Sequence, residues 1–427
     1  MKNSFGTDGI RQKSTEFTND FLFKLGQGLS LFNCNNVFVG IDTRNSSQFL
    51  AFSIISGLLS VGMDVTYLSV VSTPIVIYQS FMHQCLGIMI TASHNDYTYN
   101  GIKIVNNGYK LSKAEQEILL DGINKTYNLR FSKLSFGGNL EYDYISYLLS
   151  NAVMTNYKVC IDCANGGNYM VAQEVFSKVC KEASFLGVKP NGININDGVG
   201  SSYIDNLKTF MLNGQFDFGF SYDGDGDRII CIDKNFDVLD GDMIILIIAY
   251  YLKKHNLLKN NCVALTIMSN LGVIKALRKL DISVIQTDVG DSNVLKCLLD
   301  NDLSLGGEAS GHIIHLDYLP TGDGLYISTL LLKIFNEMAD EIYKLIKSVK
   351  LYHNKMINIK VKDKSSIVDN IFLKKRINDI KFELAYDCKI ILRASGTEDV
   401  IRLSVMAQDE DVVDKYISEL KSWITSI

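Results

Sequence analysis

The chain has 427 residues, of which 47% are hydrophobic and 21% are charged, a composition typical of globular proteins and long enough for several domains. Its 42 basic and 47 acidic residues give a net charge of −5, which excludes nucleic acid as the main partner, because binding along a phosphate backbone requires a dominant basic surface. The longest apolar run, residues 243–252, is about half the length that spans a bilayer, so we expect no membrane partner.

The nine cysteines are scattered along the chain, and the first residues are polar, without the apolar segment of a signal peptide. Only Cys160 and Cys163 have C-x-x-C spacing, and no second pair completes a zinc site. We interpret the cysteines as buried thiols of a cytoplasmic protein in a reducing compartment, with metal or redox use of this pair as the alternative.

The N-terminal part of the chain alternates strand and helix patterns. Residues 36–41 and 64–68 have the pattern of strands, residues 48–59 that of a helix, and Thr73-Pro74 begins another helix. Strands that alternate with helices in this way predict crossover connections and a mostly parallel sheet.

A buried strand at residues 85–90 ends in the turn Thr91-Ala92-Ser93-His94-Asn95, and a second strand is predicted at residues 102–105. In open α/β sheets, ligands bind at the carboxyl ends of the strands. Ser93 is therefore a candidate nucleophile or phosphoryl carrier, with His94 and Lys103 beside it as proton handlers or charges. This segment alone leaves a plain polar turn as the alternative.

A polar stretch at residues 130–139 lacks helical periodicity and predicts the end of a first domain. The chain then continues with alternating patterns up to a lysine-rich stretch, which we interpret as a solvated surface around a linker. We expect domains at residues 1–140, 141–240, 241–347 and 348–427. The further predicted elements are helices at 142–149, 169–177, 271–280, a buried one over 243–252 and a long one ending near 347, and strands at 158–163, 217–221, 262–268, 388–393 and 400–406.

The run Asp223-Gly224-Asp225-Gly226-Asp227-Arg228 is the strongest local signal. Three carboxylates in five residues repel one another unless a cation neutralises them, and the two glycines allow the backbone to curl so that they converge. Oxygen ligands of this kind suit Mg²⁺, whereas the spacing does not fit an EF-hand. A solvated acidic turn is the alternative. Arg228 beside the loop fits a phosphate that bridges it and the metal.

The segment Gly306 to His312 places Glu308, Ser310 and His312 at alternate positions. In an extended segment these three side chains face one side, which suits hydrogen bonds to sugar hydroxyls, with His312 available for proton transfer. A structural turn is the equally weighted alternative.

A second polar segment near the C-terminus has the composition of a phosphate-binding loop. Arg393 and Arg402 flank the hydroxyls of Ser395 and Thr397 and the backbone N–H groups at Gly396 and Thr397, a set that could wrap one dianion. It lacks the Gly-Lys-Ser/Thr ending of a Walker loop. At the N-terminus, Arg11 adds a further cation on a glycine-containing turn. The sequence thus offers a candidate nucleophilic serine, a metal-binding loop, a segment that could bind sugar hydroxyls and a segment that could bind phosphate. Phosphoryl transfer on a sugar phosphate uses all four.

In this order the motifs resemble those of the α-D-phosphohexomutase superfamily, over essentially the whole chain, and within it most closely the bacterial phosphoglucosamine mutases. The segments that carry the resemblance are Phe5-Gly-Thr-Asp-Gly-Ile-Arg11, Ile161-Asp-Cys-Ala-Asn-Gly166, Pro190-Asn-Gly-Ile-Asn-Ile-Asn196, Met268-Ser-Asn-Leu-Gly272 and Thr321-Gly-Asp-Gly324.

The resemblance implies an α/β protein of four domains, three similar α/β units and a smaller, phosphate-binding C-terminal α+β unit. It implies an isomerase that interconverts glucosamine 6-phosphate and glucosamine 1-phosphate through a bisphosphorylated sugar, for UDP-N-acetylglucosamine and cell-wall precursor synthesis. A phosphomannomutase or phosphoglucomutase with the same mechanism is the alternative. The partner would be a hexosamine phosphate, and the resemblance leaves open a homodimer and activation by glucose- or glucosamine-1,6-bisphosphate.

The resemblance also implies a role for each candidate residue. Ser93 would be phosphorylated and would hold one Mg²⁺ per active site together with the three aspartates. His312 and Lys103 would act as acid and base, and Arg11, His94 and Arg228 would stabilise the transferring charge. Glu308 and Ser310 would read the sugar, and the distal phosphate would be held by Arg393, Ser395, Gly396, Thr397 and Arg402.

Four positions depart from the usual pattern of the superfamily. Asp96 and Asp399 stand in place of prolines, and Asp96 puts a further carboxylate near Ser93. Ala309 replaces a typical glutamine in the sugar loop and bears on the choice of substrate, and Ser292 replaces a usual arginine. None of these departures removes a residue that carries the chemistry.

Overall fold

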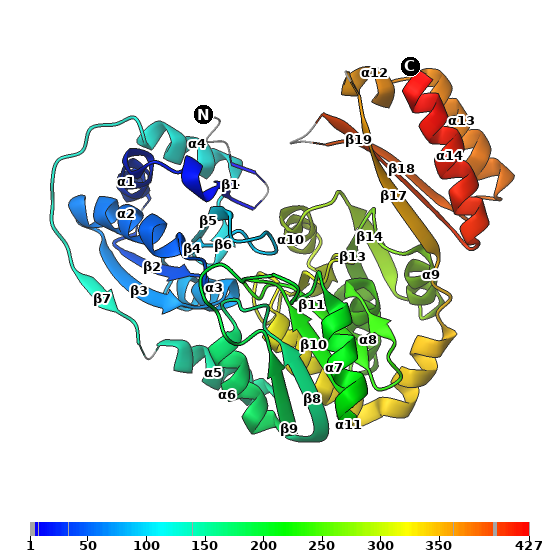
Figure 1. Cartoon of the computed structure of the whole chain (residues 1–427), viewed down its shortest axis with the longest axis horizontal. Helices are drawn as coiled ribbons and strands as arrows, with labels where there is room; N and C mark the ends of the chain where they lie inside the picture. The colour runs from blue at the N-terminus through cyan, green and yellow to red at the C-terminus, as the bar shows by residue number, and fades with distance from the viewer. Residues whose placement is uncertain are drawn as a thin grey trace.

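The computed structural model describes residues 5, 6, 8–32, 34–138, 140–361, 363–395 and 399–426. In this part of the chain, four β-sheets follow one another in sequence. Figure 1 shows them arranged around an arc, with the N-terminal sheet at one end and the C-terminal sheet at the other. The predicted α/β class, with several α/β units and a distinct C-terminal unit, is confirmed.

The first sheet has seven strands in the order β1-β5-β4-β2-β3-β7, with β6 paired to β5. Its strands β4, β2, β3 and β7 are parallel, as predicted, whereas β5 and β1 add antiparallel pairings at the other side of the sheet. The strands are β1 Ile10–Lys13, β2 Asn36–Ile41, β3 Asp64–Val70, β4 Leu86–Ile90, β5 Tyr99–Asn106, β6 Tyr109–Lys110 and β7 Leu134–Phe136, and the helices are α1 Asn19–Gly28, α2 Ser47–Ser60, α3 Thr73–Met82 and α4 Lys113–Gly122.

The strand β7 lies inside the polar stretch that we interpreted as a boundary. Its three residues pair in parallel with Val65, Thr66 and Tyr67 of β3, so the first sheet extends to Phe136. A strand this short at a sheet edge has too few alternating apolar residues to be recognised from the sequence.

The second and third sheets share one hydrophobic core, and α8 and α11 contribute much of it. Almost every residue of α8 is buried, so the prediction of a buried helix is confirmed, and the Asp240 side chain caps its first turn by accepting from the Met243 N–H at 3.0 Å. The elements of the second unit are α5 Leu140–Asn151, β8 Thr155–Asp162, α6 Tyr169–Val179, β9 Cys180–Leu186, α7 Ile204–Gly214, β10 Phe218–Tyr222, β11 Ile229–Asp233 and β12 Val238–Leu239. Those of the third are α8 Gly241–Lys254, β13 Cys262–Thr266, α9 Leu271–Lys279, β14 Ser283–Thr287, α10 Asp291–Asp300, β15 Leu305–Gly307, β16 Ile313–His315 and α11 Gly324–Ser348.

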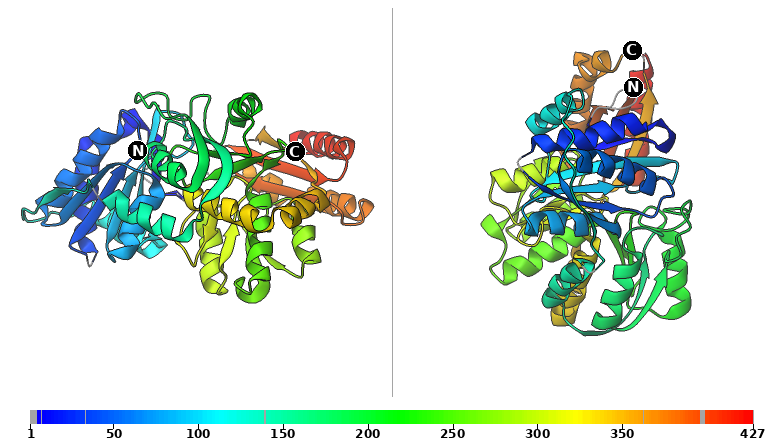
Figure 2. Two further views of the ribbon diagram at one scale, coloured as in Figure 1. Left: turned by 90° about the horizontal axis from the view of Figure 1, so that it is seen from below. Right: turned by 90° about the vertical axis from the view of Figure 1, so that its left-hand side faces the viewer.

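The C-terminal unit has a three-stranded antiparallel sheet in the order β17-β19-β18 and a hydrophobic cluster of its own. Figure 2 shows it at the opposite end of the molecule from the first sheet. Its elements are β17 His353–Lys360, α12 Lys364–Val368, α13 Ile371–Glu383, β18 Lys389–Ala394, β19 Val400–Ala407 and α14 Glu410–Ser426.

The predicted helices and strands are present with small shifts at their ends. All nine cysteines are free, and Cys160 and Cys163 are buried, as expected for thiols of a protein core. Within the described ranges, no helix has the length and apolar character needed to cross a bilayer.

Candidate active site

Ser93 lies in the loop that leaves the carboxyl end of β4, and it is 1% exposed. Its φ of 52° is in the left-handed region, which costs a residue other than glycine on the order of 1–3 kcal/mol and persists only where the surroundings impose it. The Ser93 hydroxyl donates to Asp223 Oδ2 at 2.6 Å and lies 3.3 Å from His94 Nδ1. The structure thus brings Ser93, from the first sheet, against the acidic loop of the second.

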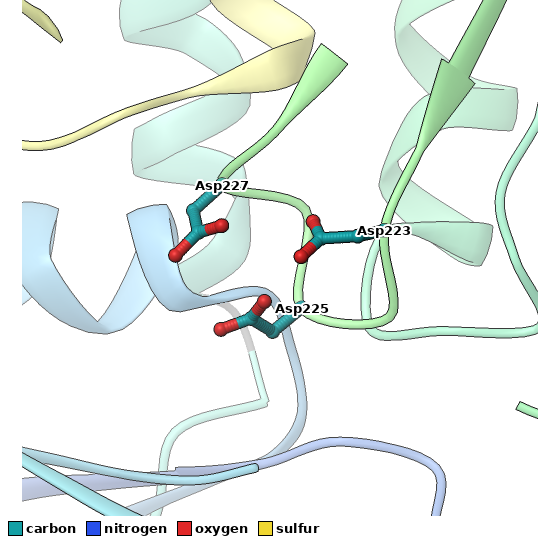
Figure 3. Close-up of side chains that lie close together, drawn as sticks. All are labelled: Asp223, Asp225 and Asp227. Carbon is teal, nitrogen blue, oxygen red and sulfur yellow. The ribbon is translucent and has the colours of Figure 1, made fainter. Parts of the chain in front are cut away.

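Asp223, Asp225 and Asp227 lie in the turn between β10 and β11, and their carboxylates surround one point (Figure 3). One oxygen from each lies within 4.8 Å of the others, and all three residues are buried. Burial and the charges of Asp227 and Asp225 raise the pKa of Asp223 well above its usual value. The convergence predicted from the two glycines is therefore present in the structure.

Lys103, on β5, pairs with two of these three carboxylates and with Asp8. Its Nζ lies 2.7 Å from Asp225 Oδ2, 2.9 Å from Asp227 Oδ2 and 3.0 Å from Asp8 Oδ2. Burial opposes the charge on Lys103, but the carboxylates of Asp225, Asp227 and Asp8 raise its pKa well above the usual value. Burial also opposes the charge on Asp227, yet Lys103 and His312 hold its pKa below the ordinary value.

The acidic cluster has unused oxygens that fit a metal ion. Asp225 Oδ1 and Asp227 Oδ1 are buried and have no hydrogen-bond partner among the described residues. A buried carboxylate oxygen without a partner is costly, and a hard divalent cation held by oxygens satisfies several at once. The donor set of these aspartates, with the adjacent Ser93 hydroxyl, therefore fits such an ion.

A second ionic chain leads from this centre to the third sheet and was not predicted. Lys110 Nζ contacts Asp8 Oδ1 at 2.6 Å and also Asp291 Oδ2, at the start of α10. His312 Nε2 lies 3.7 Å from the same Asp291 oxygen and 3.9 Å from Asp227 Oδ2. A lysine in a strand of mixed polarity carries no signal in the sequence, because only the packing of two sheets reveals its partners.

The cations predicted to stabilise charge lie around Ser93. Arg228 Nε is 3.9 Å from Asp223 Oδ2, is buried, and has no hydrogen-bond partner in the described part of the chain. Arg11 contacts Asp8 Oδ2 at 3.2 Å and Asn95 Oδ1 at 3.3 Å. Partial loss of solvation and the charges of Arg228 and Arg11 lower the pKa of the exposed His94 to about 4, so this imidazole is neutral at physiological pH. An anion placed among these groups would offset their mutual repulsion.

The expectation that residues 308–312 are extended is wrong. The segment is a tight turn between β15 and β16, in which the Gly311 N–H donates to the Glu308 carbonyl and the Glu308 N–H donates to that of His312, each at 3.0 Å. Gly311 has a φ of 93°, which favours glycine and allows the chain to reverse. As a result Glu308, Ser310 and His312 do not share one strand face: Ser310 is exposed and His312 is 4% exposed.

The two arginines of the predicted phosphate cradle lie next to each other on adjacent strands of the C-terminal sheet. Arg393 and Arg402 are register partners on β18 and β19. Burial and the charge of Arg402 lower the pKa of Arg393, while Glu308 and Asp288 of the third unit act in the opposite direction. Like charges directly opposite each other destabilise a sheet, which favours an anion between them. Ser395 follows β18, whereas Gly396 and Thr397 lie outside the described residues.

Asp96, which replaces a usual proline, was expected to place a carboxylate near Ser93, but its side chain points to a different group. It is exposed, and its Oδ1 accepts from the Thr98 N–H at 2.8 Å, which closes a local turn. The sequence analysis also missed Arg44 and Asn196, which donate to backbone carbonyls of the Ser93 loop. For Arg44 a signal was present, because Asp42-Thr43-Arg44 follows a buried strand whose carboxyl end lies at the site.

The sequence and the fold both have relatives among known proteins. The sequence matches the family descriptions Phosphoglucomutase/phosphomannomutase, alpha/beta/alpha domain I over residues 2–130, alpha/beta/alpha domain III over residues 240–352, and C-terminal domain over residues 356–421. It is 38% identical to a phosphoglucosamine mutase of Listeria welshimeri, covering 100% of this chain and 99% of the relative. It is 36% identical to a phosphoglucosamine mutase of Lysinibacillus sphaericus, covering 98% and 97%.

A similar fold is found in a phosphoglucomutase/phosphomannomutase family protein from Burkholderia thailandensis, with a TM-score of 0.84 at 20% identity over 98% of this chain and 97% of that one. An N-acetylphosphoglucosamine mutase from Aspergillus fumigatus has the same architecture, with a TM-score of 0.69 at 15% identity over 98% and 94%. The chain therefore belongs to the phosphoglucomutase/phosphomannomutase family of the α-D-phosphohexomutase superfamily.

Proposed function

We propose that this protein is a phosphoglucosamine mutase, which interconverts glucosamine 6-phosphate and glucosamine 1-phosphate. The observation that carries the proposal is the 2.6 Å contact between the Ser93 hydroxyl and Asp223 Oδ2, within a buried cluster of three carboxylates. Its choice of sugar rests on the full-length similarity to relatives named phosphoglucosamine mutase.

In this mechanism Ser93 carries the phosphoryl group. In the transfer to substrate, the bond between phosphorus and Ser93 Oγ breaks as a bond to the sugar hydroxyl oxygen forms, and the hydroxyl proton passes to a basic group. The sugar bisphosphate then reorients and returns its other phosphate to Ser93. Arg228, Arg11 and the neutral His94 lie close enough to Ser93 to stabilise the transferring charge.

Asp223, Asp225 and Asp227, with the Ser93 oxygen, would hold Mg²⁺. Bound there, the ion would neutralise charge on the phosphoryl group. Lys103 contacts two of the same carboxylates and supplies positive charge at this point, and its raised pKa suits it to donate a proton rather than to accept one. His312 is the other acid/base candidate, because its Nδ1 is buried and has no hydrogen-bond partner in the described ranges.

The substrate would bridge the third and fourth units. Glu308 and Ser310, on the turn between β15 and β16, would contact the sugar, and Arg393, Ser395, Gly396, Thr397 and Arg402 would hold the phosphate that is not being transferred. Support comes from the opposed arginines and from the influence of Glu308 on the pKa of Arg393, which requires the two groups to be near each other. We further propose a cytoplasmic enzyme, activation by glucose- or glucosamine-1,6-bisphosphate, and a homodimer as its assembly.

Phosphomannomutase or phosphoglucomutase activity is the alternative, and Ala309 in the sugar loop is the observation that keeps it open. The test compares kcat/KM for glucosamine, mannose and glucose phosphates with one enzyme preparation. We expect the amino sugar to be preferred; preference for either other sugar would refute the proposed substrate while leaving the mechanism in place.

Intact mass measurement tests the carrier role. Wild type incubated with glucose 1,6-bisphosphate should carry one phosphate on Ser93, and Ser93→Ala should carry none and lose mutase activity. An Ala variant with full activity would refute the mechanism. Ser201→Ala, in a loop of the second unit, is a matched control in which activity should persist.

A further inference from the structure

One buried arginine holds the loop that carries Ser93. Arg44 follows β2, and its side chain is 0% exposed. Its Nη2 donates to the carbonyl oxygens of Ser93 at 3.0 Å and Asn95 at 2.9 Å. Its Nη1 donates to the carbonyl oxygen of Tyr99 at 3.1 Å and to that of Asp96. A single guanidinium thus binds four carbonyl groups of one loop.

The guanidinium itself is fixed in orientation by Asp42. Arg44 Nε lies 2.8 Å from Asp42 Oδ2, and Asp42 Oδ1 accepts from the Arg44 N–H at 3.1 Å and from the Ser47 hydroxyl at 2.7 Å. Because Asp42 occupies Nε, the two Nη groups are left to face the loop. A lysine could not reproduce this arrangement, since it lacks the planar array of donors.

Asn196, from the loop between β9 and α7, completes the contact from the second unit. Its Nδ2 donates to the same carbonyl oxygens, at 2.8 Å for Ser93 and 2.9 Å for Asn95. A side chain at Gly224 of the acidic loop would come within 2.7 Å of the Ser93 carbonyl oxygen and 2.8 Å of Asn196 Nδ2. The held carbonyl therefore lies directly against the acidic loop.

These contacts account for the backbone conformation at Ser93. Its φ of 52° is one that serine seldom adopts, and the Ser93 carbonyl accepts two hydrogen bonds in that conformation. The same conformation directs the hydroxyl to Asp223 Oδ2 at 2.6 Å. Arg44 and Asn196 thus act on the position of the reacting oxygen through the backbone.

We propose that Arg44, assisted by Asn196, is a positioning residue that fixes the Ser93 hydroxyl against Asp223 and thereby sets the rate of phosphoryl transfer, with no part in substrate affinity. This rests on the proposed function of Ser93. The Arg44 side chain donates hydrogen bonds to Asp42 and to loop carbonyls, none of which belongs to the predicted sugar loop or phosphate cradle.

The test uses the full-length variants Arg44→Met, Arg44→Lys and Asn196→Ala, with Arg278→Met on the exposed side of α9 as the control. Displacing a reacting group by about 1 Å can cost about 100-fold in rate. We expect Arg44→Met to lower kcat by about that factor and to slow phosphorylation of Ser93 by glucose 1,6-bisphosphate equally, with KM changed less than about 3-fold. Arg44→Lys should lie between Arg44→Met and wild type, Asn196→Ala should lose about 10-fold in kcat, and Arg278→Met should match wild type.

Hydrogen exchange over residues 93–99 gives a readout that does not depend on activity. Exchange should accelerate there in all three site variants and remain unchanged in the other units. A general structural role would instead lower the melting temperature and leave kcat per folded molecule unchanged, and that result would overturn the proposal. If Arg44→Met does not fold, the same measurements are made on Arg44→Lys and Asn196→Ala. Unchanged hydrogen exchange over residues 93–99 in both variants would overturn the proposal. An inactive wild type would refute the proposed function alone, because the exchange measurement still tests the positioning of the loop.

Discussion

We propose that the centre around Ser93 and the arginine cradle of the C-terminal unit both bind phosphate groups, yet the two regions are built differently. Ser93, Asp223 and Asp225 are at most 1% exposed, and β10, which leads into the acidic loop, packs in the core shared by the second and third sheets. Arg393 and Arg402 are half-buried and stand on a sheet with a core of its own. The first region is part of a large continuous interior, and the second is a separate unit beside it.

This difference has a physical reason. Buried charges must be paired, so the aspartates, Lys103 and Asp8 fix one another in a tight array whose geometry suits chemistry. The cradle places two like charges opposite each other, an arrangement that a bound anion would stabilise. We therefore expect damage at the centre to lower kcat and damage at the cradle to raise KM.

The largest effect should come from the acidic loop. Asp225→Asn removes negative charge where the proposed Mg²⁺ binds and where Lys103 is paired, so kcat should fall at least about 100-fold. Steady-state kinetics over a Mg²⁺ titration, with calorimetric Mg²⁺ binding, would measure it, and chelation of metal from wild type should have a similar effect. The exposed Asp237→Asn, in the turn between β11 and β12, should behave like wild type. Unimpaired Mg²⁺ binding by Asp225→Asn would contradict the proposed ligand set.

At the cradle, Arg393→Met should raise KM by about 10- to 100-fold, because a charge-assisted hydrogen bond to phosphate contributes about 1.5–3 kcal/mol. The kcat at saturating substrate should fall much less. The exposed Lys375→Met, in the same unit, removes one positive charge away from the sheet and should leave both constants unchanged. A loss confined to kcat would contradict the proposal that the cradle acts on substrate binding and the centre on the transfer step.

A buried carboxyl group in the shared core should also make stability depend on pH. Burial raises the pKa of Asp323, at the start of α11, to about 6 from an ordinary value of 3.8. Between these values the folded state binds more protons than the unfolded state, so this residue makes stability fall as pH rises from about 4 to about 6.

Asp323→Asn removes that titration, so its stability relative to wild type should increase over this range by about 1–3 kcal/mol. Denaturant unfolding at a series of pH values would measure the difference. A constant difference between the two proteins from pH 4 to pH 6 would contradict the buried, raised pKa.

The smallest effect is expected at the surface turn beside Ser93. Asp96→Ala removes the acceptor for the Thr98 N–H but leaves the Asp96 carbonyl in contact with Arg44. Activity should stay within about 3-fold of wild type, and stability should change by about 0.5 kcal/mol, as for other exposed positions. Thermal melts and kcat of the variant would show it. A large loss of kcat would mean that the Asp96 carboxylate acts on the phosphoserine loop after all.

The sequence alone determined the fold class and the types of residue at the centre. The strands before Ser93 and Asp223 could be predicted because buried strands are continuous apolar runs, and the acidic loop stood out because three close carboxylates demand a cation. The resemblance to the superfamily added the order of the motifs and the role of each candidate residue.

Only the tertiary structure decided how these groups are paired and held. Several contacts of the site join residues that are far apart in the chain, those of Lys110 with Asp291 and of Arg44 and Asn196 with the Ser93 loop. No sequence pattern predicts such pairs. The turn at residues 308–312 likewise depends on the pairing of β15 with β16, which alternation of residue types does not reveal. Ser93 itself was found from its place at a strand end, but the left-handed backbone and the buried arginine that orient its hydroxyl follow from packing, because hydrogen bonds between distant segments exist only in the folded chain.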